Sequence, residues 1–188
     1  MNPYYTQTLI PTPKIDCKSV WPTDPTDPTD TKPRWKPIPV VNSELWDEEI
    51  YNKLKECRLV PRIARVFRWA PNNCYTWHID GDANKGLVVP FCINWIVEGA
   101  GLIQWNRDIK LQMPSRQQAG LNLGYYNGGI EDSYEEQTSG HACIVNTEIT
   151  HRVVNLENIH RLSISIMFDF NLTYSDTIKE LTKHGLIQ

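Results

Sequence analysis

The sequence predicts a mainly β domain, a sandwich or a barrel, with helices before and after its strands. Short strand-like segments rich in Val, Ile and aromatic residues recur between residues 62 and 170, and turn signals such as EGAG at 98–101 separate them. Amphipathic helical patterns precede and follow this region. With 188 residues, the chain is long enough for one domain with its own core and too short for two of ordinary size.

The first 42 residues form a Pro-rich arm, and residues 43–188 form the expected domain. The arm contains the repeat PTDPTDPTD at 22–30. Because proline fixes φ and removes a hydrogen-bond donor, we expect polyproline-like or irregular backbone here. Trp21 and Trp35 could hold the arm against the domain. The alternative is a Pro-rich motif that binds a partner.

Two helices are expected at the ends of the domain. Ser43 is a candidate N-cap for a helix that continues to about Arg58, because acidic residues crowd its first turn and basic residues its last. A second helix is expected to begin at Ser175 and to end before Gly185. A helix placed before a run of strands suits the covering of one face of a sheet.

The strand pattern is clearest at the end of the domain. In RLSISIMFDF, Arg161 and Ser163 share one face of the predicted strand, and the apolar residues share the other. If helices cover the apolar face, the polar face looks into a cavity, where a buried guanidinium needs an anionic partner. The sequence offers no obvious fixed carboxylate, which favours a ligand. The predicted strands are residues 62–70, 87–98, 102–106, 142–147, 150–155 and 161–170.

Residues 107–140 interrupt the strand pattern. Insertions of this length inside a domain are usually functional or mobile, so we interpret this one as a lid over the cavity. It is expected to contain a short hairpin that turns at 125–129. The alternative is a surface excursion without a catalytic purpose.

Composition narrows the class of protein. The net charge of −3 and the pI near 5.9 give no overall basic field, so nucleic-acid binding is not expected. The five cysteines have no CxxC spacing, which favours a reducing setting. No apolar run approaches the roughly 18 residues of a membrane span, and the N-terminus does not resemble a signal peptide. We therefore expect a soluble cytoplasmic protein. Its oligomeric state is not predicted.

Three residues are candidate metal ligands. His78 and Asp80 are separated by one residue, so in a strand they point to the same side, about 7 Å apart at Cα. His151 lies in a separate predicted strand and Arg161 opens another. Two imidazoles and one carboxylate form a facial set that leaves three positions of an octahedral Fe(II) open.

These residues resemble the signature of the Fe(II)- and 2-oxoglutarate-dependent dioxygenases. The pattern is His78-x-Asp80, then His151, then Arg161-x-Ser163. The surrounding WHIDGD, PFCINWIVEGAGLIQW and VNTEITHRVVN are similar to small uncharacterised bacteriophage members of that superfamily. The resemblance covers residues 60–170, and it implies a double-stranded β-helix, or jelly roll, flanked by helices.

The resemblance also implies the chemistry. His78, Asp80 and His151 would hold Fe(II), and Arg161 and Ser163 would bind the distal carboxylate of 2-oxoglutarate, with Asn94 facing the same co-substrate. With O2, such an enzyme converts 2-oxoglutarate to succinate and carbon dioxide while it hydroxylates a peptide, a protein or a small molecule. If the protein is phage-encoded, its location would be the host cytoplasm.

Other residues and other functions stay open. Tyr75 and Trp77 could line the site or belong to the core, Gln104 is a weaker candidate, and Asn146 with Thr147 is expected to form a turn. His141, His160 and His184 are not expected to be ligands. The alternatives to an enzyme are a non-catalytic jelly-roll or cupin-like module that binds another divalent ion such as zinc or manganese, and a structural virion or interaction protein.

Overall fold

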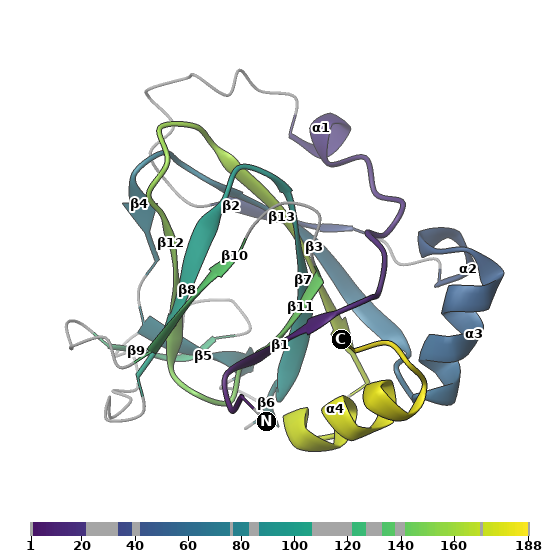
Figure 1. Ribbon diagram of the computed structural model, residues 1–188. Coiled ribbons are helices and arrows are strands. Elements are labelled where there is room, and N and C mark those ends of the chain that lie inside the picture. The colour runs from purple at the N-terminus through teal and green to yellow at the C-terminus, as the bar shows by residue number, and fades with distance from the viewer. Residues whose placement is uncertain are drawn as a thin grey trace.

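The protein is built from two antiparallel sheets that face one another, with helices outside one of them (Figure 1). This architecture is a double-stranded β-helix of the cupin-like class, the fold that the resemblance implies. From β7 onward the chain repeatedly crosses from one sheet to the other. The computed structural model describes residues 2–21, 34–38, 42–75, 77–82, 87–106, 122–126, 133–137, 142–169 and 171–187.

The larger sheet has six strands within the described residues, all antiparallel to their neighbours. β13 lies near its centre, between β7 and β3, where both of its edges are hydrogen-bonded. In spatial order the strands are β1 (Tyr5–Thr8), β11 (Ala142–Asn146), β7 (Phe91–Glu98), β13 (Arg161–Phe168), β3 (Pro61–Trp69) and β2 (Arg34–Ile38).

The smaller sheet has seven strands, counted over the same part of the chain. Its central path runs through β10 (Ser133–Gln137), β8 (Gly101–Trp105), β12 (His151–Asn155), β5 (Trp77–Asp82) and β6 (Leu87–Val88). Off this path, β4 (Asn73–Cys74) pairs with β12, and β9 (Asn122–Tyr126) pairs with β5.

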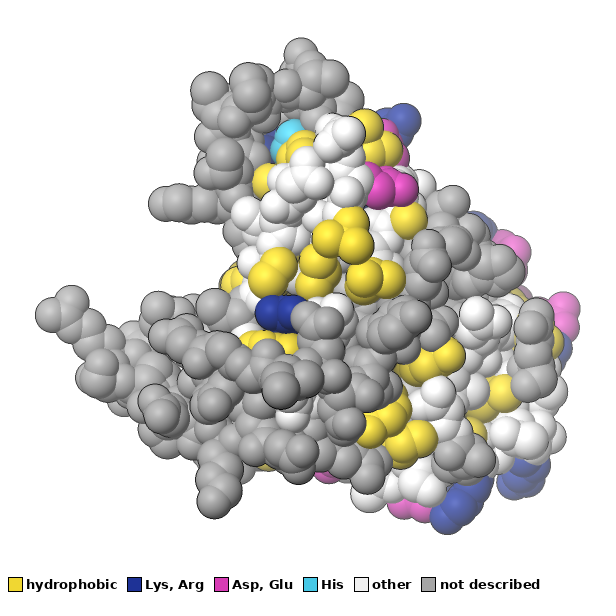
Figure 2. Space-filling model, turned by 60° about the vertical axis from the view of Figure 1, so that its left-hand side comes forward, with side chains coloured by type: hydrophobic (Ala, Val, Ile, Leu, Met, Phe, Trp, Pro, Cys, Tyr) yellow, Lys and Arg dark blue, Asp and Glu magenta, His cyan; other side chains and the backbone are white. Residues whose placement is uncertain are grey.

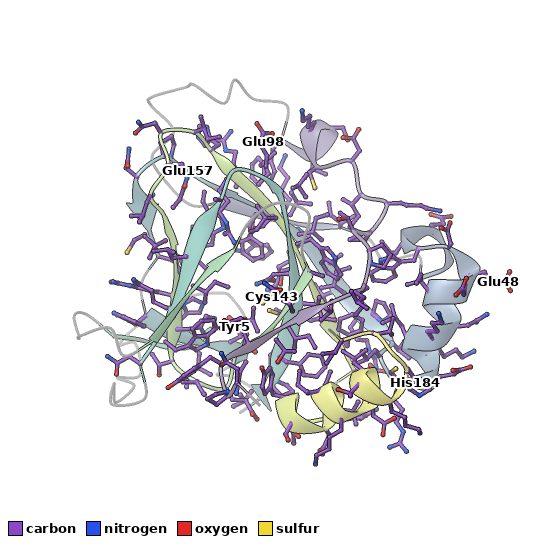
Figure 3. All side chains as sticks on the ribbon, in the orientation of Figure 1. Tyr5, Glu48, Glu98, Cys143, Glu157 and His184 are labelled. Carbon is purple, nitrogen blue, oxygen red and sulfur yellow. The ribbon has the colours of Figure 1, made fainter. Side chains whose placement is uncertain are left out.

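The two faces of β13 differ as its alternating sequence predicts. Ile164 and Ile166 are fully buried and belong to the main hydrophobic core, together with residues of the flanking helices. Met167, on the other face, belongs to a second cluster between the sheets that includes Trp105. Figure 3 shows side chains filling this interior. The helices are α1 (Cys17–Val20), α2 (Asn42–Leu45), α3 (Glu48–Glu56) and α4 (Tyr174–Lys183).

The prediction of an irregular N-terminal arm is wrong for three segments, because β1 and β2 form the two edges of the larger sheet and α1 is a short helix. Pro37 lies within β2, and an edge strand tolerates proline since one side of its backbone has no ladder to complete. Trp21 does attach the arm, because its indole N–H donates to the carbonyl of Val66 at 3.2 Å. The repeat at 22–30 lies outside the described residues.

The two predicted helices differ from expectation at their starts. The first is divided into α2 and α3, because Trp46 turns into the core and its indole N–H donates to Pro11 O at 2.8 Å. Asp47 then becomes the N-cap of α3. The last helix is capped by Thr173 and not by Ser175, since the Thr173 hydroxyl accepts from the backbone N–H of Asp176. None of the described helices is long and apolar enough to cross a membrane.

The predicted hairpin within 107–140 is also wrong. β9 pairs with β5, and β10 pairs with β8, so the two segments join different strands of the smaller sheet. Tyr125 and Tyr126 therefore belong to a strand, where a turn was predicted. The remaining residues of the expected lid, and His141, lie outside the described part of the chain. The predicted strand at 87–98 is interrupted before Phe91, which separates β6 from β7.

Candidate metal centre

His78, Asp80 and His151 meet on the inner face of the smaller sheet. His78 and His151 are direct partners in the register of β5 with β12, and Asp80 follows two residues after His78 on the same face. One ligand atom from each residue can be chosen so that all lie within 4.8 Å of one another. The imidazole rings of the two histidines are 4.4 Å apart at their centroids.

The hydrogen bonds of this triad suit metal ligation. The Nδ1 atom of His151 lies 2.9 Å from the carbonyl oxygen of Ile149, so Nδ1 carries the proton and Nε2 keeps its lone pair. The Nε2 atom of His78 lies 3.4 Å from Oδ1 of Asp80. Both imidazoles are nearly buried, with 6% and 4% of their surface exposed.

The electrostatics favour a neutral imidazole beside a charged carboxylate. Burial, reinforced by His78, lowers the pKa of His151 to about 4. For Asp80, burial acts to raise the pKa, but the hydrogen bond with His78 and the influence of His151, His78 and Arg65 hold it below its usual value. Metal ligation needs these two protonation states.

The donor set fits a divalent transition metal. Two imidazole nitrogens and one carboxylate oxygen suit Fe(II), and the same set accepts zinc or manganese. The carboxylate would offset part of the metal's charge. The triad alone therefore supports a metal site and does not select the ion.

Arg161 lies in the space between the two sheets. Its side chain starts on the inner face of β13 and reaches Gly101 of β8, where a built Cβ would stand 2.8 Å from both its Cδ and its Nε. Only 1% of its surface is exposed, and burial lowers the pKa of the guanidinium to about 9. A cation with that pKa still carries its charge at neutral pH.

Polar side chains continue along the inner face from Arg161. Ser163 and Ser165 follow at alternate positions of β13, and Ser165 is the register partner of Asn94 on β7. Asn94 shares its face with Cys92, whose thiol donates to Oδ1 of Asn94 at 3.5 Å. The two strands thus present a polar strip toward the smaller sheet.

Backbone contacts hold the loop that precedes His151. Thr147 is fully buried; its hydroxyl donates to Val89 O at 2.6 Å, and its carbonyl accepts from the backbone N–H of Asp80 at 3.3 Å. The turn predicted at Asn146 and Thr147 therefore ties the start of β12 directly to β5. These bonds fix the separation of the two halves of the triad.

The next turn is held in a similar way. The side-chain amide of Asn155, itself fully buried, donates to Ala70 O and Ile159 O at 2.9 Å each. Glu157 accepts from the backbone N–H of Ala100 at 3.0 Å. Figure 3 labels Glu157 and Glu98 at this same end of the molecule, where β13 begins with Arg161.

The weaker candidates divide between the two faces of the smaller sheet. Tyr75 contacts the site, because its ring meets that of His78 edge to face at 4.9 Å. Gln104 faces the other way and accepts from Arg152 Nε at 2.7 Å, while Arg152 covers the ring of the buried Trp77 at 4.6 Å. Figure 2 shows the molecule from the side that is on the left in Figure 1, where hydrophobic side chains lie next to basic ones.

His160 and His184 lie outside the triad. His160 is buried at the end of the turn before β13, with 3% of its surface exposed. His184 is the C-cap of α4, and its Nδ1 lies 3.4 Å from a carboxylate oxygen of Glu56.

Two residues near the site were missed by the sequence analysis. Gly101 leaves the space that the Arg161 side chain occupies, although EGAG indicates only a turn. Arg65 lies on the inner face of β3 as the register partner of Ser165 and influences the carboxylate of Asp80. Strand alternation could have placed Arg65 on one of two faces, but no motif marks it.

The comparisons with known proteins return distant likenesses of fold. No family model matches the sequence, and the search of curated proteins returned no match. Among solved structures, a Klebsiella pneumoniae protein with a double-stranded β-helix domain has 10% identity and a TM-score of 0.42 over 78% of this chain and 85% of its own. A Salinispora arenicola cupin 2 conserved barrel protein has 11% identity and a TM-score of 0.41 over 82% and 87%.

A third match is the polyketide cyclase RemF from Streptomyces resistomycificus, with 11% identity and a TM-score of 0.37 over 58% of this chain. The present chain spans 55% of the length of that cyclase. Because all three likenesses are distant, the function of this chain is inferred from its own residues.

Proposed function

We propose that this protein is an Fe(II)- and 2-oxoglutarate-dependent dioxygenase that hydroxylates a peptidyl or small-molecule substrate. One observation carries the proposal: a triad of two imidazoles and a carboxylate faces an interior that also holds the buried guanidinium of Arg161. This combination fits a metal that is chelated by a dicarboxylate. Bound Fe(II) and 2-oxoglutarate would supply oxidative decarboxylation to succinate, coupled to hydroxylation with O2.

The chain's own residues would bind and orient the two groups. His78, Asp80 and His151 would hold the metal, with the His151 ring oriented by its bond to Ile149 O. Arg161 would bind the distal carboxylate of 2-oxoglutarate through two parallel hydrogen bonds, and the Ser163 hydroxyl would add a third. Asn94 is the register partner of Ser165, and its side chain would face 2-oxoglutarate.

Burial at this site would strengthen each of these interactions. His78, His151 and Arg161 are each at most 6% exposed, so their hydrogen bonds form with little competition from water. Trp105, itself fully buried, is the register partner of His151 on β8 and adds an apolar side chain next to the triad. Exclusion of water also protects a reactive site from side reactions.

The test is turnover of 2-oxoglutarate without a primary substrate. The full chain, supplied with Fe(II), O2 and 2-oxoglutarate, is expected to form succinate slowly, and His151→Ala is expected to form none. Arg62→Gln is the control, because Arg62 is exposed and pairs with Asp169 outside the site. Absence of succinate from the wild-type protein, with Fe(II) shown to be bound, would contradict the proposal.

The second candidate is a non-catalytic cupin-like protein that binds a divalent ion. The donor set supports it, because two histidines and an aspartate also accept zinc or manganese. In that case the protein would bind the ion with full occupancy and leave 2-oxoglutarate unchanged. The same assay therefore separates the two candidates.

A further inference from the structure

Arg65 is a second buried arginine on the inner face, and the proposed binding of 2-oxoglutarate does not use it. It lies on β3 between Pro37 of β2 and Ser165 of β13 in the register of the larger sheet. Its side chain is 9% exposed. Its guanidinium carbon lies 4.6 Å from the centroid of the Trp35 ring.

The guanidinium of Arg65 has unused hydrogen-bonding capacity. Within the described part of the chain, the guanidinium stacks on the Trp35 ring and makes no hydrogen bond or ion pair, and its Nε is buried without an acceptor. A guanidinium has five donors in a planar fork, and leaving even the Nε donor buried and unsatisfied costs free energy. This arrangement indicates a binding site for an anion.

Arg65 and the metal triad lie on the facing inner surfaces of the two sheets, Arg65 on the larger sheet and the triad on the smaller. Asp80 and Arg65 influence each other electrostatically, in the direction expected for opposite charges. A divalent ion bound to Asp80 would offset the negative charge of that carboxylate. The electrostatic attraction between Asp80 and Arg65 would then be weakened. Metal binding should therefore make the binding of an external anion by Arg65 more favourable.

The charges of the inner face support the same conclusion. Over the described residues there, Arg65 and Arg161 are positive, Asp80 is negative and the thiol of Cys92 is neutral, because burial and Asp80 raise its pKa. A divalent ion brings the site to three positive charges, and the two negative charges of 2-oxoglutarate leave one. That remaining charge is available to the primary substrate.

Trp35 gives this site access to solvent. Its ring is 45% exposed on the edge strand β2, while Arg65 beneath it is nearly buried. The pair therefore presents an exposed aromatic residue at the edge of the larger sheet and a nearly buried cation on its inner face. We infer that Arg65, stacked on Trp35, binds a carboxylate or phosphate of the primary substrate beside the metal triad. This inference rests on the proposed function, because it takes the triad as the reacting centre.

The experiment uses two anionic probes and a neutral one of the same shape. Benzoate, phenyl phosphate and benzamide are titrated calorimetrically into the full chain loaded with Zn(II) and 2-oxoglutarate. Wild-type protein is expected to bind at least one anionic probe about tenfold or more tightly than benzamide, since hydrogen bonds between two charged groups are stronger than those to a neutral group. The comparison of benzoate with phenyl phosphate tells which anion is preferred.

Variants assign the preference to Arg65. Arg65→Gln is expected to bind the anionic probes no better than benzamide, and Arg65→Lys, which keeps the charge, to retain part of the difference. Arg62→Gln, an exposed cation on the same strand, should keep the full difference. Circular dichroism and thermal unfolding of each variant identify any loss of fold.

Two results would overturn the inference. One is equal binding of anionic and neutral probes by the wild-type protein. The other is a loss of 2-oxoglutarate affinity in Arg65→Gln as large as that in Arg161→Ala, which would assign Arg65 to the co-substrate. Since the titration uses Zn(II) and measures binding, its outcome is separate from the succinate assay that tests the proposed function.

Discussion

The two faces of β13 differ in what they contribute: the outer face packs in the core, and the inner face carries polar side chains. Ile164 and Ile166 point outward into the core that the helices close, and both are fully buried. Ser163 and Ser165, their immediate neighbours, point inward and are buried as well. The two faces are therefore both buried, and they differ in the polarity of their side chains. The outer face supplies hydrophobic stabilisation, and the inner face keeps polar groups whose burial has to be offset by partners or ligands.

The largest effect is expected when a triad residue is removed. Asp80→Ala should weaken Fe(II) or Zn(II) binding by more than about a hundredfold, because loss of even an outer partner of a metal ligand typically costs 10- to 100-fold. The free energy of unfolding of the metal-free protein should change little. Calorimetric metal titration measures the first and urea unfolding the second. Asp47→Ala, at an exposed surface ion pair, is the control, and unaltered metal affinity of Asp80→Ala would remove this residue from the site.

The next prediction compares neighbours on opposite faces. Ile164→Ala should reduce the free energy of unfolding by about 2–5 kcal/mol, because it leaves a cavity in the main core. Ser165→Ala should change it by about 1 kcal/mol or less, since it removes one small polar group. Urea unfolding of both variants is the measurement. Equal losses would mean that the inner face contributes to stability as much as the outer one does.

Arg161→Ala tests the inner face alone. It should weaken 2-oxoglutarate binding to the metal-loaded protein by about 2–5 kcal/mol, the range expected when a buried charge loses its partner. Titration under nitrogen with Mn(II) measures this affinity without turnover. An unchanged dissociation constant would place the dicarboxylate elsewhere.

The effect of Gly101→Ala should be smaller than that of Asp80→Ala, Ile164→Ala or Arg161→Ala. The new methyl group would stand 2.8 Å from the Arg161 side chain and 2.9 Å from Val154 O, so both must shift. Overpacking of this kind costs about 1–3 kcal/mol of stability, and the displaced guanidinium should bind 2-oxoglutarate less tightly. The loss of affinity should shrink when the substitution is made in the Arg161→Ala background. Additive losses would show that Gly101 does not act through Arg161.

Strand alternation and ligand spacing were the reliable signals in the sequence. RLSISIMF predicts both faces of β13 because the side-chain period of a strand is 2, and the outer face is covered by helices as expected. The approach of His78 to His151 also follows the prediction, although their pairing across β5 and β12 is a long-range feature that spacing alone does not give. Their roles as metal ligands remain predictions.

The failures have identifiable physical causes. The proline content of the arm concealed β2, because an edge strand accepts Pro37 where a central strand would not. The break between α2 and α3 depends on the long-range contact of Trp46 with Pro11, which no local pattern contains. Arg65 was overlooked because alternation gives a residue's face only after the identity of the inner face is known.

The pairing of β5 with β12 has a consequence for the protein's breathing motions. Within the described strands their register contains a single pair, His78 with His151, so the two strands have few backbone bonds to hold them together. A metal ion bound by His78 and His151 would link the two strands at this pair. The apo form should then exchange the amide protons of both strands with deuterated solvent faster than the loaded form does, and the melting temperature should climb with metal concentration.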